Sequence, residues 1–168
     1  MRYLRAQAET HPRGAARLGL PNIRTELQDA SVCREEWKDS ADVVLCDVPC
    51  SGLGIIRKKP EIRFKNPDEI RTLPEIQAKI LANCAQYVKK GGTLVYSTCT
   101  ILQRENEDVV RAFLTENPEF EAVSWTHPVC GERADGMVTL LPPVHNTDGF
   151  FIAKMHRKVN NGKLRMEN

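Results

Sequence analysis

Two stretches of the chain carry nearly uninterrupted apolar residues, and each is followed at once by polar residues and a cysteine. Residues 41–48, ADVVLCDV, show little alternation, which predicts a strand buried on both faces of a parallel sheet. Residues 93–98, TLVYST, predict the next strand. Cys50 and Cys99 therefore lie at the carboxyl ends of two strands, where open α/β sheets place their ligand sites.

Between these strands the apolar residues recur at helical spacing over residues 67–88. Asn66 followed by Pro67 predicts the N-cap and first position of that helix. The basic residues and glycines of 89–92 predict its end. Further helices are expected over residues 3–18 and 103–117, and short strands over residues 23–28, 119–123, 137–141 and 149–156.

The alternation of strands and helices predicts an α/β architecture with a mainly parallel sheet. The 168 residues fit one domain, residues 1–158, followed by a polar tail, residues 159–168. The net charge of +2 does not by itself demand a nucleic-acid partner. No apolar run approaches the ~20 residues that span a bilayer, and no secretory signal is visible, so no membrane partner is expected. The six cysteines form no CxxC pair or zinc-type spacing, which predicts reduced thiols, a cytoplasmic protein and no metal site.

Three segments of the chain carry a more specific signal. DVPCSGLGIIRKKPEIRF and GGTLVYSTCTILQRENEDVV, with the closing TDGFFIAK, resemble the Sun/RsmB (Fmu) family of RNA 5-methylcytosine methyltransferases. The resemblance runs from about residue 18 to residue 158. It implies a Rossmann-like class I methyltransferase sheet, S-adenosyl-L-methionine as cofactor, and RNA as substrate, most like 16S ribosomal RNA.

The resemblance also implies a role for four residues. Cys99 corresponds to the nucleophile that adds to carbon 6 of cytosine, so that carbon 5 can take a methyl group. Cys50 corresponds to the cysteine that assists release of the methylated product. Asp47 corresponds to the residue that bonds the cytosine edge close to the cofactor, and Asp29 to an acidic residue placed against the adenine.

A basic cluster follows the first motif, with five Lys or Arg residues within positions 57–65: Arg57, Lys58, Lys59, Arg63 and Lys65. RNA phosphate is the partner that such a cluster would bind, and an ordinary solvated loop is the alternative. The target base would have to be single-stranded or flipped out to reach the cysteines.

The sequence also departs from the family pattern. The family's first strand with its glycine-rich loop, and its second strand with an acidic residue, have no counterpart here, which implies a sheet incomplete at its N-terminal side. We therefore expect an incomplete cofactor site, weak or no cofactor binding, and self-association through the uncovered edge at 42–47. Two alternatives stay open: an inactive remnant that keeps RNA affinity, and a redox or thiol-metal protein that uses Cys46 and Cys50.

Overall fold

The computed structural model describes residues 14–159, which divide into two units at Val32 and Cys33. In the first unit, residues 14–17 form a helical turn, and residues 18–32 have no regular helix or strand. The strand expected at 23–28 is therefore wrong, because no strand pairs with this segment and an extended backbone gains its hydrogen bonds only from a neighbour. Residues 3–13 of the expected first helix, and the tail from residue 160, lie outside the described residues.

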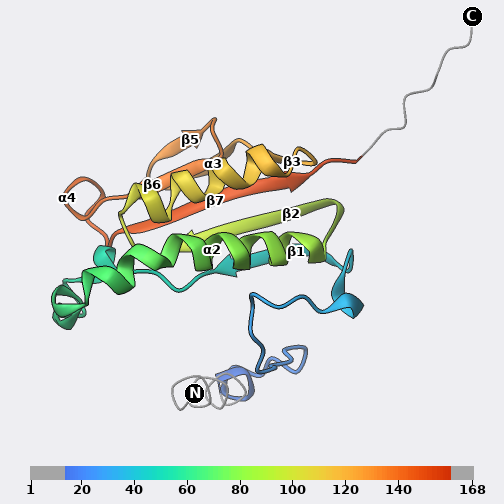
Figure 1. The fold of residues 1–168 in the computed structure, drawn as a ribbon, viewed down its shortest axis with the longest axis horizontal. Helices are drawn as coiled ribbons and strands as arrows, with labels where there is room; N and C mark the ends of the chain where they lie inside the picture. The colour runs from blue at the N-terminus through green and yellow to red at the C-terminus, as the bar shows by residue number, and fades with distance from the viewer. Residues whose placement is uncertain (1–13, 160–168) are drawn as a thin grey trace, which may run out of the picture. The chain divides into compact units, whose positions relative to one another are not determined.

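The second unit is built on a mixed five-stranded sheet (Figure 1). Its strands are β1 (Ala41–Asp47), β2 (Val88–Thr98), β3 (Phe120–Ala122), β6 (Met137–Leu140) and β7 (Phe150–Arg157). β1 pairs in parallel with β2, and β7 runs antiparallel beside β2 and pairs with both β3 and β6. The expected α/β sheet is confirmed, but the expectation of a mainly parallel sheet is wrong, because β7 runs antiparallel to each of the strands it pairs with. The parallel pair β1 and β2 ends in the two cysteine motifs.

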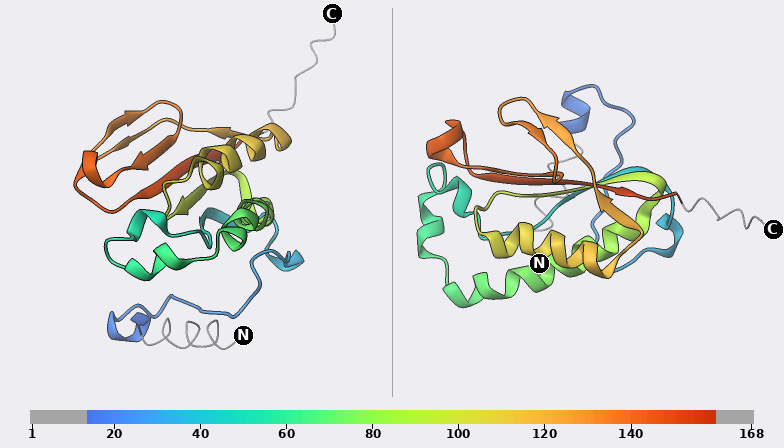
Figure 2. Two further views of the ribbon diagram at one scale, coloured as in Figure 1. Left: turned by 60° about the vertical axis from the view of Figure 1, so that its left-hand side comes forward. Right: turned by 90° about the horizontal axis from the view of Figure 1, so that it is seen from above.

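Helices α2 (Pro67–Tyr87) and α3 (Glu107–Glu116) lie on the same face of this sheet (Figure 2). α2 begins where the sequence predicts, because the side chain of Asn66 accepts a hydrogen bond from the backbone N–H of Asp68 at 3.0 Å. Among residues 14–159, no helix has both the length and the apolar character needed to cross a bilayer.

Shorter elements connect the strands and helices. They are η1 (Glu35–Trp37), η2 (Leu53–Ile55), η3 (Pro60–Phe64), η4 (Gln103–Glu105), α4 (Pro142–His145), and the hairpin strands β4 (Trp125–His127) and β5 (Gly131–Arg133). The sequence did not predict the hairpin, because strands of three residues are too short to show alternation.

Two element boundaries differ from expectation. α2 ends at Tyr87 and β2 follows at once, so the glycines at 91–92 lie inside the strand rather than beyond the helix. A Cβ added to Gly92 would lie 2.9 Å from the carbonyl oxygen of Lys89, so this close backbone approach requires glycine. The helix expected at 103–117 is divided at Asn106, whose backbone is not helical and whose side chain is fully buried.

The core lies between the two helices and the sheet. Leu81 of α2, Leu94 of β2 and Phe151 of β7 are completely buried, and the ring of Tyr96 meets that of Phe151 edge to face at 6.1 Å. Each such side chain stabilises the fold by about 1.5–3 kcal/mol through removal from water. The carboxyl ends of β1 and β2 therefore emerge from a well-packed base.

The other face of β1 is much more open. Val43 and Leu45, which alternate with residues packed on the helices, are 64% and 67% exposed. Farther along this face, Trp125 of the hairpin lines a shallow hollow together with Val95 and Ile152. The prediction that this strand is buried on both faces is therefore wrong, because only its helix side is packed, and Val43 and Leu45 form an exposed strip at the edge of the sheet.

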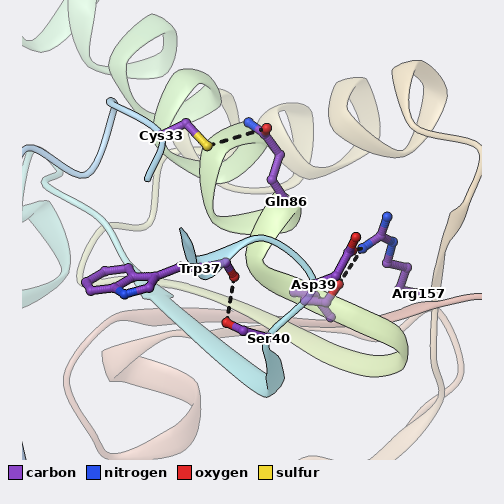
Figure 3. Close-up of polar contacts among 7 residues, drawn as sticks. Cys33, Trp37, Asp39, Ser40, Gln86 and Arg157 are labelled. Atoms are coloured by element: carbon purple, nitrogen blue, oxygen red, sulfur yellow. Dashed lines mark hydrogen bonds and ion pairs between the residues drawn. The ribbon is translucent and has the colours of Figure 1, made fainter. Parts of the chain in front are cut away.

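Residues 33–40, which lead into β1, are tied to the end of α2 and to β7 (Figure 3). The thiol of Cys33 donates to the side-chain oxygen of Gln86 at 3.6 Å. Asp39 forms an ion pair with Arg157 of β7. These contacts fix the start of the strand that carries the first cysteine motif.

Candidate active site

The ends of β1 and β2 bring the predicted catalytic residues together. Asp47 is the register partner of Ser97, whose hydroxyl donates to the Asp47 carboxylate at 2.8 Å. Just beyond the strands, the Sγ atoms of Cys50 and Cys99 lie 3.2 Å apart. Asp47 is exposed and both thiols are partly buried. A carboxylate and two thiols thus share one edge of the sheet.

The two thiols of this pair differ in acidity. A hydrogen bond from Cys50 lowers the pKa of Cys99 to about 7, although burial and the charge of Asp47 act in the opposite direction. The same hydrogen bond, together with burial, raises the pKa of Cys50. Cys99 is therefore the more acidic thiol of the pair and about half ionised at pH 7, and a thiolate is the form that a cysteine nucleophile requires.

Gly54 holds the loop that follows Cys50 against the backbone of Cys99. Its N–H donates to the carbonyl of Cys99 at 3.0 Å, and its own carbonyl accepts from the N–H of Gly149 at 2.8 Å. A Cβ on Gly54 would lie 2.1 Å from the carbonyl oxygen of Gly149, so only glycine fits. Both cysteine motifs and the closing Asp-Gly segment therefore meet in the structure.

The basic residues of the loop fall into distinct groups. Arg57 and Lys58 both form ion pairs with Asp148, and the hydrogen bond from Lys58 is the main reason that the pKa of this carboxyl is lowered. Lys59 and Arg63 are exposed. These four residues share one loop beside the cysteines, as the RNA-binding hypothesis requires.

Lys65 has a different role from the rest of the cluster. Its ammonium group donates to the carbonyl of Ser51 at 2.7 Å and to that of Cys50 at 3.4 Å. It therefore braces the first cysteine motif, and its charge helps to lower the pKa of Cys99. The neighbouring Phe64 is 88% exposed, an unusual position for an aromatic side chain.

Asp29, the residue expected near the adenine, lies in the first unit. Its carboxylate accepts hydrogen bonds from the hydroxyl of Ser31 at 2.7 Å and from the Ser31 N–H at 2.9 Å. These bonds lower the pKa of Asp29 and form a turn of the kind that aspartate commonly stabilises. Its contact with a cofactor stays a prediction.

Cys46 does not pair with Cys50 as the redox alternative requires. Its thiol is hydrogen-bonded to Cys84 of α2, which raises the pKa of Cys46 and lowers that of Cys84. The alternative pairing is therefore wrong, because Cys46 points into the core while Cys50 lies beyond the strand end.

Reasoning from the sequence missed the polar residues buried behind the two cysteine loops. Glu105, Gln77 and Asn106 are completely buried. The signal was the Glu-Asn pair directly after the second motif, where a solvent-exposed helix start was expected. Gln77 gave no signal, because a polar residue within an amphipathic helix is ordinarily assigned to the exposed face.

Two thiols, one of them with a lowered pKa, and a carboxylate lie together at the ends of parallel strands, the edge where α/β proteins bind their ligands. Comparison with known proteins gives the family. The model of the family described as 16S rRNA methyltransferase RsmB/F matches residues 7–156. The chain belongs to this family.

Individual relatives support the same assignment. The probable ribosomal RNA small subunit methyltransferase B of Bacillus subtilis is 44% identical over 151 residues, which cover 86% of this chain and 34% of the relative. The ribosomal RNA small subunit methyltransferase B of Thermus thermophilus is 38% identical over 156 residues, 91% of this chain and 37% of the relative. The chain thus spans about a third of the length of these curated relatives.

A solved structure shows the same fold. The methyltransferase homologue protein from Pyrococcus horikoshii matches with a TM-score of 0.69 and 28% identity, covering 85% of this chain and 47% of that one. The Rossmann-like class I methyltransferase sheet implied by the sequence resemblance is thereby confirmed.

Proposed function

We propose that this chain is the catalytic part of an S-adenosyl-L-methionine-dependent RNA (cytosine-5-)-methyltransferase that acts on 16S ribosomal RNA. The observation that carries the proposal is the pair of thiols 3.2 Å apart beside Asp47. Family membership supports methylation of ribosomal RNA in the cytoplasm, and the two cysteines support cytosine carbon 5 as the target.

The chemistry follows from the state of each side chain. The Cys99 thiolate adds to carbon 6 of cytosine, which makes carbon 5 nucleophilic, while Asp47 bonds the ring edge and stabilises the protonated ring. The cofactor supplies an electrophilic methyl group on a sulfonium centre. After transfer, solvent water takes the proton of carbon 5, the electron pair left behind re-forms the double bond between carbons 5 and 6, and the bond between carbon 6 and Cys99 breaks, so the thiolate is restored. Cys50, which holds a proton beside the Cys99 sulfur, assists this release.

Asp47 is the first proposed contact with the cofactor, because this exposed carboxylate lies at the end of β1. Asp29 is the second proposed contact, although its carboxylate already accepts two hydrogen bonds from Ser31. Asp47 and Asp29 are the cofactor contacts that the family resemblance supplies, and we expect weak or no cofactor binding by the isolated chain. Micromolar affinity in a calorimetric titration would contradict that expectation.

RNA would be held by the basic loop beside the cysteines. Exposed Lys59 and Arg63 are proposed to contact phosphates, and Arg57 and Lys58 to do so from their ion pairs with Asp148. The salt dependence of RNA binding tests this proposal. Each lost phosphate contact reduces the steepness of log affinity plotted against log salt concentration by about 1.

Methyl transfer from labelled cofactor to ribosomal RNA tests the catalytic roles. We expect Cys99→Ala to abolish transfer and Cys50→Ala to accumulate a covalent RNA adduct, with Cys130→Ala as the matched control outside the site. Transfer that persists in Cys99→Ala would refute the nucleophile. Active Cys50→Ala protein without any adduct would remove Cys50 from the mechanism.

A second candidate is an inactive remnant that keeps RNA affinity. The exposed basic residues Lys59 and Arg63 would supply the RNA affinity of such a protein. RNA binding by wild-type protein without any methyl transfer would support this candidate.

Self-association also stays a proposal, based on exposed Val43 and Leu45 at the β1 edge. Sedimentation analysis of wild type and Leu45→Glu would test it.

A further inference from the structure

Glu105, Gln77 and Asn106 form a buried polar network behind the two cysteines. The residues before and after each cysteine are hydrogen-bonded to it. Cys50 stands between Pro49 and Ser51, and Cys99 between Thr98 and Thr100. All four neighbours form hydrogen bonds with groups of that network. The backbone on both sides of each sulfur is therefore held from behind.

On the Cys50 side, Glu105 is the central acceptor. Its Oε2 atom accepts from the Ser51 N–H at 2.9 Å and from Nε2 of Gln77 at 2.9 Å. The same Gln77 nitrogen donates to the Pro49 carbonyl at 3.0 Å. Glu105 and Gln77 thus fix the peptide units before and after Cys50.

On the Cys99 side, Asn106, which follows Glu105 in the sequence, acts in the same way. The Asn106 side chain accepts from the Thr98 hydroxyl at 2.6 Å and donates to the Thr100 carbonyl at 3.1 Å. A further bond between the hydroxyls of Ser51 and Thr100, at 2.8 Å, joins the two cysteine loops directly.

The network is anchored in the core. The hydroxyl of Tyr96, itself completely buried, donates to the carbonyl of Glu105 at 2.6 Å. A buried carboxylate costs free energy relative to an apolar side chain of similar size, unless hydrogen bonds compensate. Hydrogen bonds weaken steeply when donor and acceptor are misaligned, so they fix orientation as well as distance. The directional bonds that Glu105 forms all lead to the cysteine loops or to the residues that support them.

From these contacts we infer that Glu105 is a positioning residue, which acts through Gln77 and the Ser51 amide to set the distance between the Cys50 and Cys99 sulfurs. The inference rests on the proposed function for its catalytic meaning. Its geometry can be tested without any methyl transfer. Loss of the anchor frees the Cys50 loop, so the sulfurs spend less time in contact and Cys99 loses its hydrogen-bond donor.

Diamide provides the direct test, because it takes one hydrogen from each thiol and becomes a hydrazine while the two sulfurs form a disulfide. We expect wild-type protein to form the Cys50–Cys99 bridge, identified by peptide mass mapping. Glu105→Ala should form it at least tenfold more slowly. Glu105→Gln keeps an oxygen acceptor for both donors and should stay within threefold of wild type. Glu107→Ala is the matched control, since Glu107 bonds Thr139 and no residue flanking either cysteine.

A second readout separates positioning from general stability. In Glu105→Ala the pH midpoint of Cys99 alkylation should move upward from about 7 toward the ordinary 9.0, whereas Glu107→Ala should leave it unchanged. Both measurements are made below the melting temperature of each variant. A purely structural role for Glu105 would lower that temperature and move neither readout.

The outcomes are distinct from those of the methylation assay. Absence of the bridge in wild type, or equal bridging rates in wild type and folded Glu105→Ala, would overturn the inference. If Glu105→Ala shows no cooperative unfolding, Gln77→Leu decides, because it removes the link from Glu105 to the Pro49 carbonyl and should slow bridging threefold or more. An unchanged rate there would overturn the inference as well. Failure of methyl transfer in wild type bears on the proposed function and leaves this geometry intact.

Discussion

Replacement of Cys50 by alanine should sharply lower the fraction of Cys99 that is thiolate at neutral pH. The hydrogen bond from Cys50 is the largest cause of the lowered pKa of Cys99, about 7 against an ordinary 9.0. Without that bond, burial and the charge of Asp47 outweigh the smaller effect of Lys65, so the pKa returns to 9.0 or above. The thiolate fraction at pH 7 then falls from about one half to about 1%, roughly fiftyfold.

The direction of the pH dependence follows from the same values. In wild type the reactivity of Cys99 should rise as pH increases through about 7 and level off above it. In Cys50→Ala the rise should occur near pH 9 or higher. Because the pKa of Cys99 is lower in the folded than in the unfolded state, its contribution to the free energy of unfolding is present above pH 9 and lost as pH falls through about 7.

Alkylation by iodoacetamide, followed at Cys99 by peptide mass mapping across pH, measures this shift. Cys50→Ser keeps a hydrogen-bond donor and should fall between wild type and Cys50→Ala. Cys33→Ala is the control for loss of a thiol, since Cys33 bonds Gln86 at the other end of α2. The reasoning is refuted by an alkylation midpoint that is the same in Cys50→Ala and wild type.

Three further changes test other parts of the structure. Gly54→Ala should lower the melting temperature and shift the pH midpoint of Cys99 alkylation. Gly14→Ala, where an added Cβ would meet nothing within 4 Å, should leave both unchanged. Equal melting temperatures for Gly54→Ala and wild type would contradict the steric argument. Phe64→Ala should weaken binding of single-stranded RNA by about 1–3 kcal/mol through loss of base stacking, and equal loss in Val129→Ala, also exposed, would rule stacking out. Leu81→Ala should lower the free energy of unfolding by about 2–5 kcal/mol in urea titration, and a loss below about 1 kcal/mol would contradict full burial.

Local sequence patterns predicted most elements of the second unit, because an apolar run, a helical spacing or a helix cap is set by residues that are close together in the sequence. β1 is a continuous apolar run that the sheet buries on its helix side, and α2 starts at an asparagine cap. The failure at 23–28 has the opposite cause: whether a segment becomes a strand depends on a partner that its own residues do not specify. The glycines at 91–92 misled for the same reason, since only the pairing with β1 shows that they lie within a strand.

The site was predictable in part. Motif resemblance selected Asp47, Cys50 and Cys99, and the parallel register explains why the three converge. The acidity of Cys99 could not be predicted, because it depends on a sulfur-to-sulfur hydrogen bond between loops 49 residues apart. Glu105 was missed because carboxylates are almost never completely buried, so an acidic residue after a motif is ordinarily assigned to the surface.

The position of the two sulfurs explains why this fold needs buried polar residues behind its active edge. Apolar packing is non-directional and tolerates shifts of a few tenths of an ångström, so it fixes a strand but not the orientation of a short loop beyond the strand end. Hydrogen bonds lose most of their strength when donor and acceptor turn away from each other. A thiol contact of 3.2 Å between two loops therefore requires directional bonds to both loops, and Glu105, Gln77 and Asn106 provide them. The acidity of Cys99 is in this sense a property of the buried network as much as of the two cysteines.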